Sequence, residues 1–101
     1  MRDIAVFSGT AHPSLAQEIC SHLDTSLSEA TITRFSNDCL HVQLLANCRE
    51  RDVFIVQPLV PPVQEHLMEL LLMMDAARGA SAARITAVIP YYSYARSDKK
   101  D

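Results

Sequence analysis

The sequence lacks several features that would place it in large classes of protein. Its nine lysine and arginine residues are outnumbered by twelve aspartate and glutamate residues, for a formal net charge of −3. Because binding to a nucleic-acid backbone needs clustered cations, this balance argues against a nucleic-acid surface. The longest apolar-rich stretch, residues 67–77, is interrupted by Glu69 and Asp75 and is far shorter than the ~20 residues that span a bilayer. The sequence therefore predicts neither a nucleic-acid partner nor a membrane partner.

Cysteine is scarce and irregularly spaced. Cys20, Cys39 and Cys48 form an odd number without a CxxC pair, and no histidine or cysteine partner lies at the spacing of metal ligands. This pattern is typical of reduced thiols in a cytosolic protein, and the N-terminus shows no apolar secretory segment. We therefore expect structural thiols, no metal site among these residues and a cytoplasmic location.

The chain does have a regular succession of apolar segments, which predicts a folded α/β domain. Apolar runs and alternations indicate strands, and apolar residues at helical spacing indicate helices. The expected strands cover residues 4–7, 30–35, 40–44, 53–56 and 85–89, and the expected helices cover about three turns from residue 13 and residues 63–78. The order of these elements predicts an open sheet with mainly parallel central strands and a β-hairpin excursion at about 30–45. Residues 1–101 are enough for one domain.

The longer predicted helix is apolar around much of its circumference. We expect its core face to be formed by Leu67, Leu70, Leu71 and Met74. Its other apolar positions include Met68, Leu72 and Met73. These apolar side chains would be buried either at a contact between subunits or against another domain, and the sequence leaves both alternatives open.

The end of the chain, residues 88–101, changes from a strand-like run to a charged segment. It passes Pro90 and three tyrosines before reaching Arg96, Asp98, Lys99, Lys100 and Asp101. Ligands of open α/β sheets bind outside the carboxyl ends of the strands, where this segment would begin. Clustered cations with nearby carboxylates suit a phosphorylated ligand and a metal ion. The alternative is an ordinary solvated tail.

Several short blocks in a fixed order carry a resemblance to a known family. The blocks are FSG at 7–9, RFS at 34–36, DVFIVQ at 52–57, LMEL at 67–70, AVIPYY at 87–92, YAR at 94–96 and DKKD at 98–101. Together they resemble the N-terminal domain of ribose-phosphate pyrophosphokinase, also called phosphoribosyl-diphosphate synthetase, over all 101 residues. The resemblance implies a three-layer α/β/α, phosphoribosyltransferase-like domain.

The resemblance also implies a reaction and its partners. The family transfers the diphosphoryl group of ATP to the C1 hydroxyl of ribose 5-phosphate, with Mg2+, giving 5-phosphoribosyl 1-diphosphate and AMP for nucleotide biosynthesis. Such a transfer depends mainly on positioning and charge neutralisation. A family chain is much longer than this one and forms homo-oligomers with an ATP site between subunits. We therefore expect part of an ATP site here, no catalytic residue, no metal ligand and no turnover by these residues alone.

The residues that would bind ATP fall into two groups. The ATP-binding candidates are Phe35, Asn37, Asp38 and Cys39 at the hairpin tip, and Arg96, Ser97, Lys99, Lys100 and Asp101 after the last strand. By resemblance, the tip reaches the adenine of a neighbouring subunit, with Phe35 stacked on the base. Arg96 contacts the ATP phosphates, and the residues from Lys99 onward begin a loop over the nucleotide.

Three positions depart from the family pattern. Asn37 and Cys39 stand where the family has carboxylates that read the adenine amino group, and Ser97 stands where glutamine is usual. The amide oxygen of Asn37 can still accept a hydrogen bond. The departures leave two other hypotheses open, namely a non-catalytic subunit that regulates active synthetases and a free-standing nucleotide-binding module.

Overall fold

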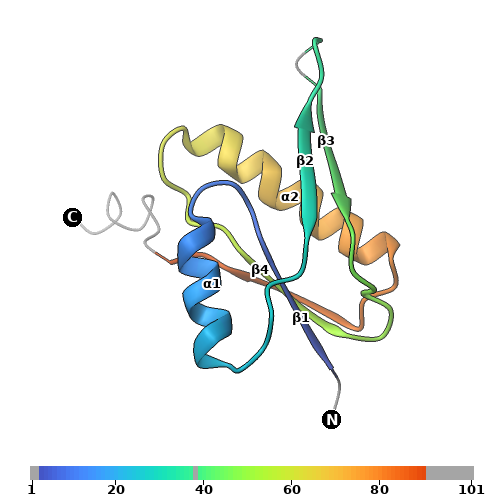
Figure 1. Cartoon of the computed structure of the whole chain (residues 1–101). Helices are drawn as coiled ribbons and strands as arrows, with labels where there is room; N and C mark the ends of the chain where they lie inside the picture. Colours follow the sequence, from blue (N-terminus) through green and yellow to red (C-terminus); the bar gives the residue numbers. More distant parts are fainter. Residues whose placement is uncertain (1–2, 38, 91–101) are drawn as a thin grey trace, which may run out of the picture.

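The computed structural model describes residues 3–37 and 39–90. Its elements are β1 (Ile4–Ser8), α1 (Pro13–His22), β2 (Ala30–Arg34), β3 (Leu40–Leu44), β4 (Asp52–Val56), α2 (Val63–Gly79) and β5 (Arg84–Val88) (Figure 1). The predicted order of strands and helices is confirmed, and β5 begins and ends one residue earlier than predicted. Both helices begin beside proline, which is well suited to a first helical turn. The ring of His12 caps α1 by accepting a hydrogen bond from the backbone N–H of Leu15 at 3.2 Å.

The strands form two separate sheets. β1, β4 and β5 make a parallel sheet in the order β1-β4-β5, in which Ser8 pairs with Val56 and Val56 pairs with Val88. β2 and β3 make an antiparallel hairpin in which Ala30 pairs with Leu44. The predicted parallel sheet and hairpin excursion are both confirmed.

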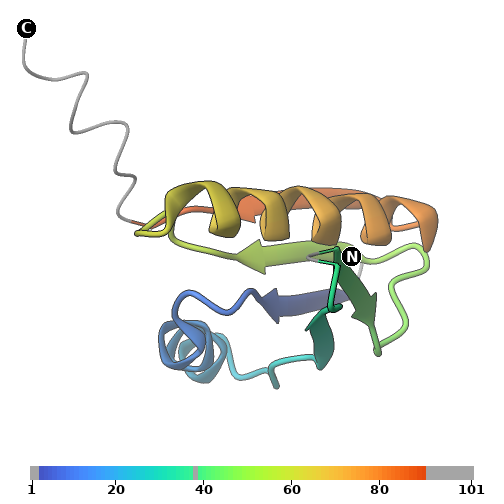
Figure 2. The same cartoon turned by 90° about the horizontal axis from the view of Figure 1, so that it is seen from above.

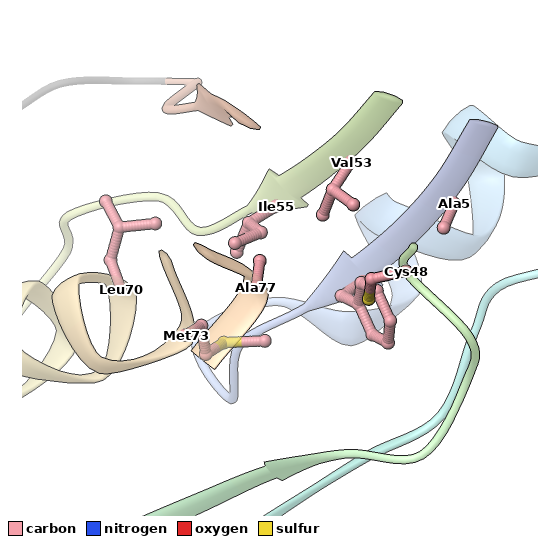
Figure 3. Close-up of a cluster of buried hydrophobic side chains, with 8 residues drawn as sticks. Ala5, Cys48, Val53, Ile55, Leu70, Met73 and Ala77 are labelled. Carbon is pink, nitrogen blue, oxygen red and sulfur yellow. The ribbon is translucent and has the colours of Figure 1, made fainter. Parts of the chain in front are cut away.

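The parallel sheet is covered on its two faces by different elements. Alternate residues of a strand point to opposite faces. Phe7 and Ile55 lie in a buried cluster with residues of α2, which also packs against β3 (Figure 3). Val6 and Val56 lie in a second cluster with Ala16 and Cys20 of α1. Figure 2 shows β1 and β4 between the two helices, so the domain has three α/β/α layers.

The core face of α2 differs from the prediction. Its buried residues are Glu69, Leu70, Met73 and Ala77, whereas Leu71 is 50% exposed. The prediction was wrong for Leu71 and Met73 because apolar residues surround this helix and its hydrophobic period does not single out one face. Packing against β3, β4 and β5 decides the orientation instead.

The cysteines of the described chain are all unpaired. Cys20 and Cys48 are buried and Cys39 is exposed. Burial raises the pKa of the Cys20 thiol, and it also raises the pKa of Cys48 against the opposing charge of Arg51. The two buried thiols therefore behave as small core residues. Over the described residues, neither helix combines the length and the apolar character needed to cross a bilayer.

Candidate functional site

The carboxyl ends of the three parallel strands form the edge at which ligands of open α/β sheets bind. Ser8, Val56 and Val88 are in register there. Two further backbone hydrogen bonds extend the ladder past the strands, from the N–H of Gly9 to Val56 O at 3.1 Å and from the N–H of Gln57 to Val88 O at 2.9 Å. Three outgoing segments leave this edge, and each can be tested as an anion site.

The first segment, between β1 and α1, uses its own donors internally. The N–H of Thr10 donates to Glu69 Oε1 at 2.9 Å, and the N–H of Ala11 donates to Gln57 Oε1 at 3.1 Å. The Thr10 hydroxyl donates to Glu69 Oε2 at 2.7 Å. The N–H groups that could bind an anion here are therefore already used, and the negatively charged Glu69 carboxylate lies next to them. This segment is unsuited to phosphate.

The second segment, between β4 and α2, has few donors to offer. Pro58, Pro61 and Pro62 have no N–H. His66 Nδ1 donates to the carbonyl oxygen of Val60 at 2.7 Å, which holds the segment against the start of α2. The third segment that leaves this edge is the one that follows β5.

The predicted ligand residues after β5 lie outside the described residues. Arg96, Ser97, Lys99, Lys100 and Asp101 all follow Pro90, the last residue that the structure describes. The structure does fix where their segment starts, because Val88 is held by the N–H of Gln57.

Some of the predicted ATP-binding residues at the hairpin tip are exposed to solvent. Phe35 is 51% exposed, and its ring centroid lies 5.9 Å from that of His41. Asn37 Oδ1 accepts a hydrogen bond from the N–H of Cys39 at 3.2 Å, and the N–H of Phe35 donates to Cys39 O at 2.8 Å. Asp38 lies outside the described residues. The exposed face of Phe35 is available for stacking, and Asn37 Oδ1 has one further lone pair.

The tip and the end of β5 are not brought together within one chain. The hairpin packs on the core through Ile32 and Val42 at the middle of its strands, and an ion pair of 3.4 Å joins Arg34, at the tip end of β2, to Glu65 of α2. Its tip projects away from the sheet, and it lies apart from the end of β5 in both views (Figures 1 and 2).

No metal site is formed by residues 3–37 and 39–90. This part of the chain has no group of three or more His, Cys, Asp or Glu side chains that could hold an ion.

Sequence reasoning missed two buried polar residues at the edge of the sheet. Gln57 is fully buried and Glu69 is 6% exposed. Gln57 Nε2 donates to Glu69 Oε1 at 2.9 Å and to the carbonyl oxygen of His66 at 3.2 Å. The signal was present in the sequence, because each is a lone polar residue within an apolar run, FIVQ and LMELLL.

Comparisons with known proteins identify the family of this chain. The family model for the N-terminal domain of ribose phosphate pyrophosphokinase matches residues 4–101. A Streptomyces coelicolor protein provisionally named ribose-phosphate pyrophosphokinase is 74% identical over all of this chain, which covers 32% of that protein. Ribose-phosphate pyrophosphokinase 1 of Oryza sativa, a chloroplastic protein, is 56% identical over 96% of this chain and 24% of its own length.

A solved structure supports the same assignment. The crystal structure of phosphoribosylpyrophosphate synthetase from Mycobacterium smegmatis is 39% identical and superposes with a TM-score of 0.88, over 98% of this chain and 33% of that one. The phosphoribosyltransferase-like fold implied by the sequence blocks is therefore confirmed. The chain spans between about a quarter and a third of the length of these relatives. It belongs to the ribose-phosphate pyrophosphokinase family, in which it corresponds to the N-terminal domain.

Proposed function

We propose that the full-length protein transfers the diphosphoryl group of ATP to ribose 5-phosphate, and that residues 1–101 supply part of its ATP site. The observation that carries this proposal is the family match over residues 4–101. The geometry supports it, since the first two segments at the carboxyl edge are closed by their own hydrogen bonds or by proline. The segment after β5, which holds Arg96 and Lys99, is left for the phosphates.

In this proposal, the ATP site is completed by a second copy of the chain in a homo-oligomer. Phe35 of one subunit stacks on the adenine, while Arg96 of its neighbour contacts the phosphates. The separation of the hairpin tip from the end of β5 within one chain supports this division. We place the protein in the cytoplasm, where its unpaired cysteines stay reduced.

The chemistry assigned to this domain is binding and orientation. In the reaction, the C1 hydroxyl oxygen of ribose 5-phosphate forms a bond to the β-phosphorus of ATP, the bond from that phosphorus to the α-β bridging oxygen breaks, and AMP leaves. Cationic side chains neutralise the transferring group, and positioning supplies much of the rate. Mg2+, when bound, adds charge neutralisation on the phosphates.

The test is product formation by the full-length protein. With ATP, ribose 5-phosphate, Mg2+ and inorganic phosphate present, we expect AMP and 5-phosphoribosyl 1-diphosphate in equal amounts. Omission of ribose 5-phosphate should abolish AMP release, which separates this transfer from ATP hydrolysis. Absence of both products would refute the proposed activity.

A second candidate function is favoured by the departures at the tip. Asn37 lacks the charge of a carboxylate, and the Cys39 side chain is a poor hydrogen-bond acceptor. A non-catalytic subunit that associates with active synthetases and regulates them would tolerate both. Co-purification with an active relative, together with no products from the protein alone, would support this function. Independent turnover would exclude it.

A further inference from the structure

Gln57 connects the elements that meet at the carboxyl edge of the sheet, partly through its side chain and partly through its backbone. Its side-chain amide bonds to the segment after β1 through Ala11, and to α2 through His66 O and Glu69. Glu69, one α-helical turn after His66, binds the backbone and the hydroxyl of Thr10. The two side chains therefore tie the segment after β1 and helix α2 to the end of β4, and the backbone N–H of Gln57 holds β5 at Val88.

The hydrogen bonds allow only one orientation of the Gln57 amide. Its oxygen faces a donor, the N–H of Ala11, and its nitrogen faces two acceptors, Glu69 Oε1 and His66 O. Glu69 in turn accepts three hydrogen bonds and faces no acceptor among these partners. A buried polar network in which every group is satisfied holds a specific geometry, because each broken bond leaves an unpaired group in a poorly solvated place.

The backbone at Gly9 lies so close to the Gln57 side-chain amide that the amide has no room to shift toward it. A Cβ atom added to Gly9 would lie 2.6 Å from Gln57 Nε2, and nearer still to Cδ and Oε1. The segment after β1 thus lies directly against the amide, with no side chain between them. Displacement of Gln57 must move that segment, and the bond to Val88 O transmits the shift to the end of β5.

We propose that Gln57 and Glu69 are positioning residues for the ATP site, because their network fixes the end of β4, and the backbone N–H of Gln57 holds the end of β5 at Val88. This inference rests on the proposed function. Neither residue is assigned contact with the nucleotide. Their effect on ATP passes through the end of β5 at Val88.

The first test compares ligand affinities in the full-length protein. For Gln57→Met, we expect the Kd for ATP to rise about tenfold, the effect of one or two lost buried hydrogen bonds, while the KM for ribose 5-phosphate stays within about twofold. Gln17→Met, an exposed glutamine on α1, is the matched control and should leave both constants unchanged. ATP affinity is measured by equilibrium titration, so the result does not depend on turnover.

The second test uses a milder change, in case Gln57→Met does not fold. Thr10→Val removes the hydroxyl bond to Glu69 at an exposed position, and Thr10→Ser keeps it. We expect Thr10→Val to weaken ATP binding by about two- to fivefold, as for one lost hydrogen bond at an exposed position, and Thr10→Ser to keep wild-type affinity.

The outcomes separate the two proposals. An active wild-type protein whose variants melt at lower temperature but bind ATP normally would show that the network is only structural, and would overturn the positioning role. Equal weakening toward ATP and ribose 5-phosphate would overturn it as well. A wild-type protein that binds ATP without forming products refutes the proposed activity, while the titrations still decide the positioning role. A wild-type protein that does not bind ATP contradicts both.

Discussion

Gln57 Nε2 lies 2.9 Å from Glu69 Oε1, and both side chains are buried where the parallel strands end. The pair combines one donor and one acceptor, and each partner is surrounded by groups of complementary type. The effect of Gln57→Glu and of Glu69→Gln on stability therefore follows from which atoms donate and which accept hydrogen bonds.

The two isosteric exchanges should differ greatly in their effect on stability. Gln57→Glu places a second carboxylate oxygen against Glu69 Oε1 and His66 O, so we expect a loss of roughly 3–5 kcal/mol, as for an uncompensated buried charge. Glu69→Gln keeps an acceptor for Thr10 N–H and Gln57, and the Thr10 hydroxyl can rotate to accept from the new amide. We expect this exchange to cost about 1 kcal/mol. Thermal melting of both full-length variants measures the difference, and equal shifts would contradict the assigned bonds.

Gly9 and Gly79 should respond oppositely to alanine. Gly9→Ala forces a methyl group into the Gln57 amide, and overpacking of this kind costs about 1–3 kcal/mol. Gly79, the last residue of α2, has open space around it, and alanine there should be neutral or stabilising by up to about 1 kcal/mol. The melting temperatures of the two variants give the comparison. A stable Gly9→Ala protein would show that the loop does not lie against Gln57.

The cysteines should differ in their reaction with thiol reagents. Cys39 is exposed, whereas Cys20 and Cys48 are buried with raised pKa values, so less of each buried thiol is ionised near neutral pH. Because the thiolate is the reactive form, we expect labelling of Cys39 first, and of the other two only after unfolding. Peptide mapping by mass spectrometry identifies the modified residue, and early labelling of Cys20 or Cys48 would contradict their burial.

Removal of the Phe35 ring should weaken ATP binding without destabilising the domain. The ring is half exposed, so Phe35→Ala has little core packing to lose, while stacking on a base contributes ~1–3 kcal/mol. We expect the Kd for ATP to rise about tenfold with little change in melting temperature. Leu45→Ala removes an equally exposed apolar side chain just beyond β3 and serves as the control. Equal effects of the two variants would exclude a specific role for Phe35.

Most of the fold could be predicted from the sequence, because strands and helices are indicated by apolar patterns within short segments. The apolar run that ends at Val56 and the alternation from Ala30 to Arg34 each predicted a strand that the structure contains. The face of α2 was not accessible, because apolar residues such as Leu71 and Met73 surround the helix and only packing chooses between them.

The site was predictable to a different extent in each of its parts. The resemblance identified the hairpin tip, and the structure shows Phe35 exposed there. It also named Arg96 and its neighbours, which remain predictions outside the described residues. The Gln57–Glu69 pair was not predictable, since the two residues are twelve positions apart and only the fold brings them together.

Complementation between two variants tests most directly whether ATP binds between subunits. In an oligomer made of one variant only, Phe35→Ala or Arg96→Ala would impair every ATP site. The assay uses ATP concentrations well below the wild-type KM. In mixed oligomers of equal composition, roughly a quarter of inter-subunit sites combine an intact tip with an intact loop. Co-expression should therefore restore roughly a quarter of the wild-type rate of AMP formation. If mixed oligomers form and show no more activity than the separate variants, the tip and the segment after β5 do not share one site across subunits.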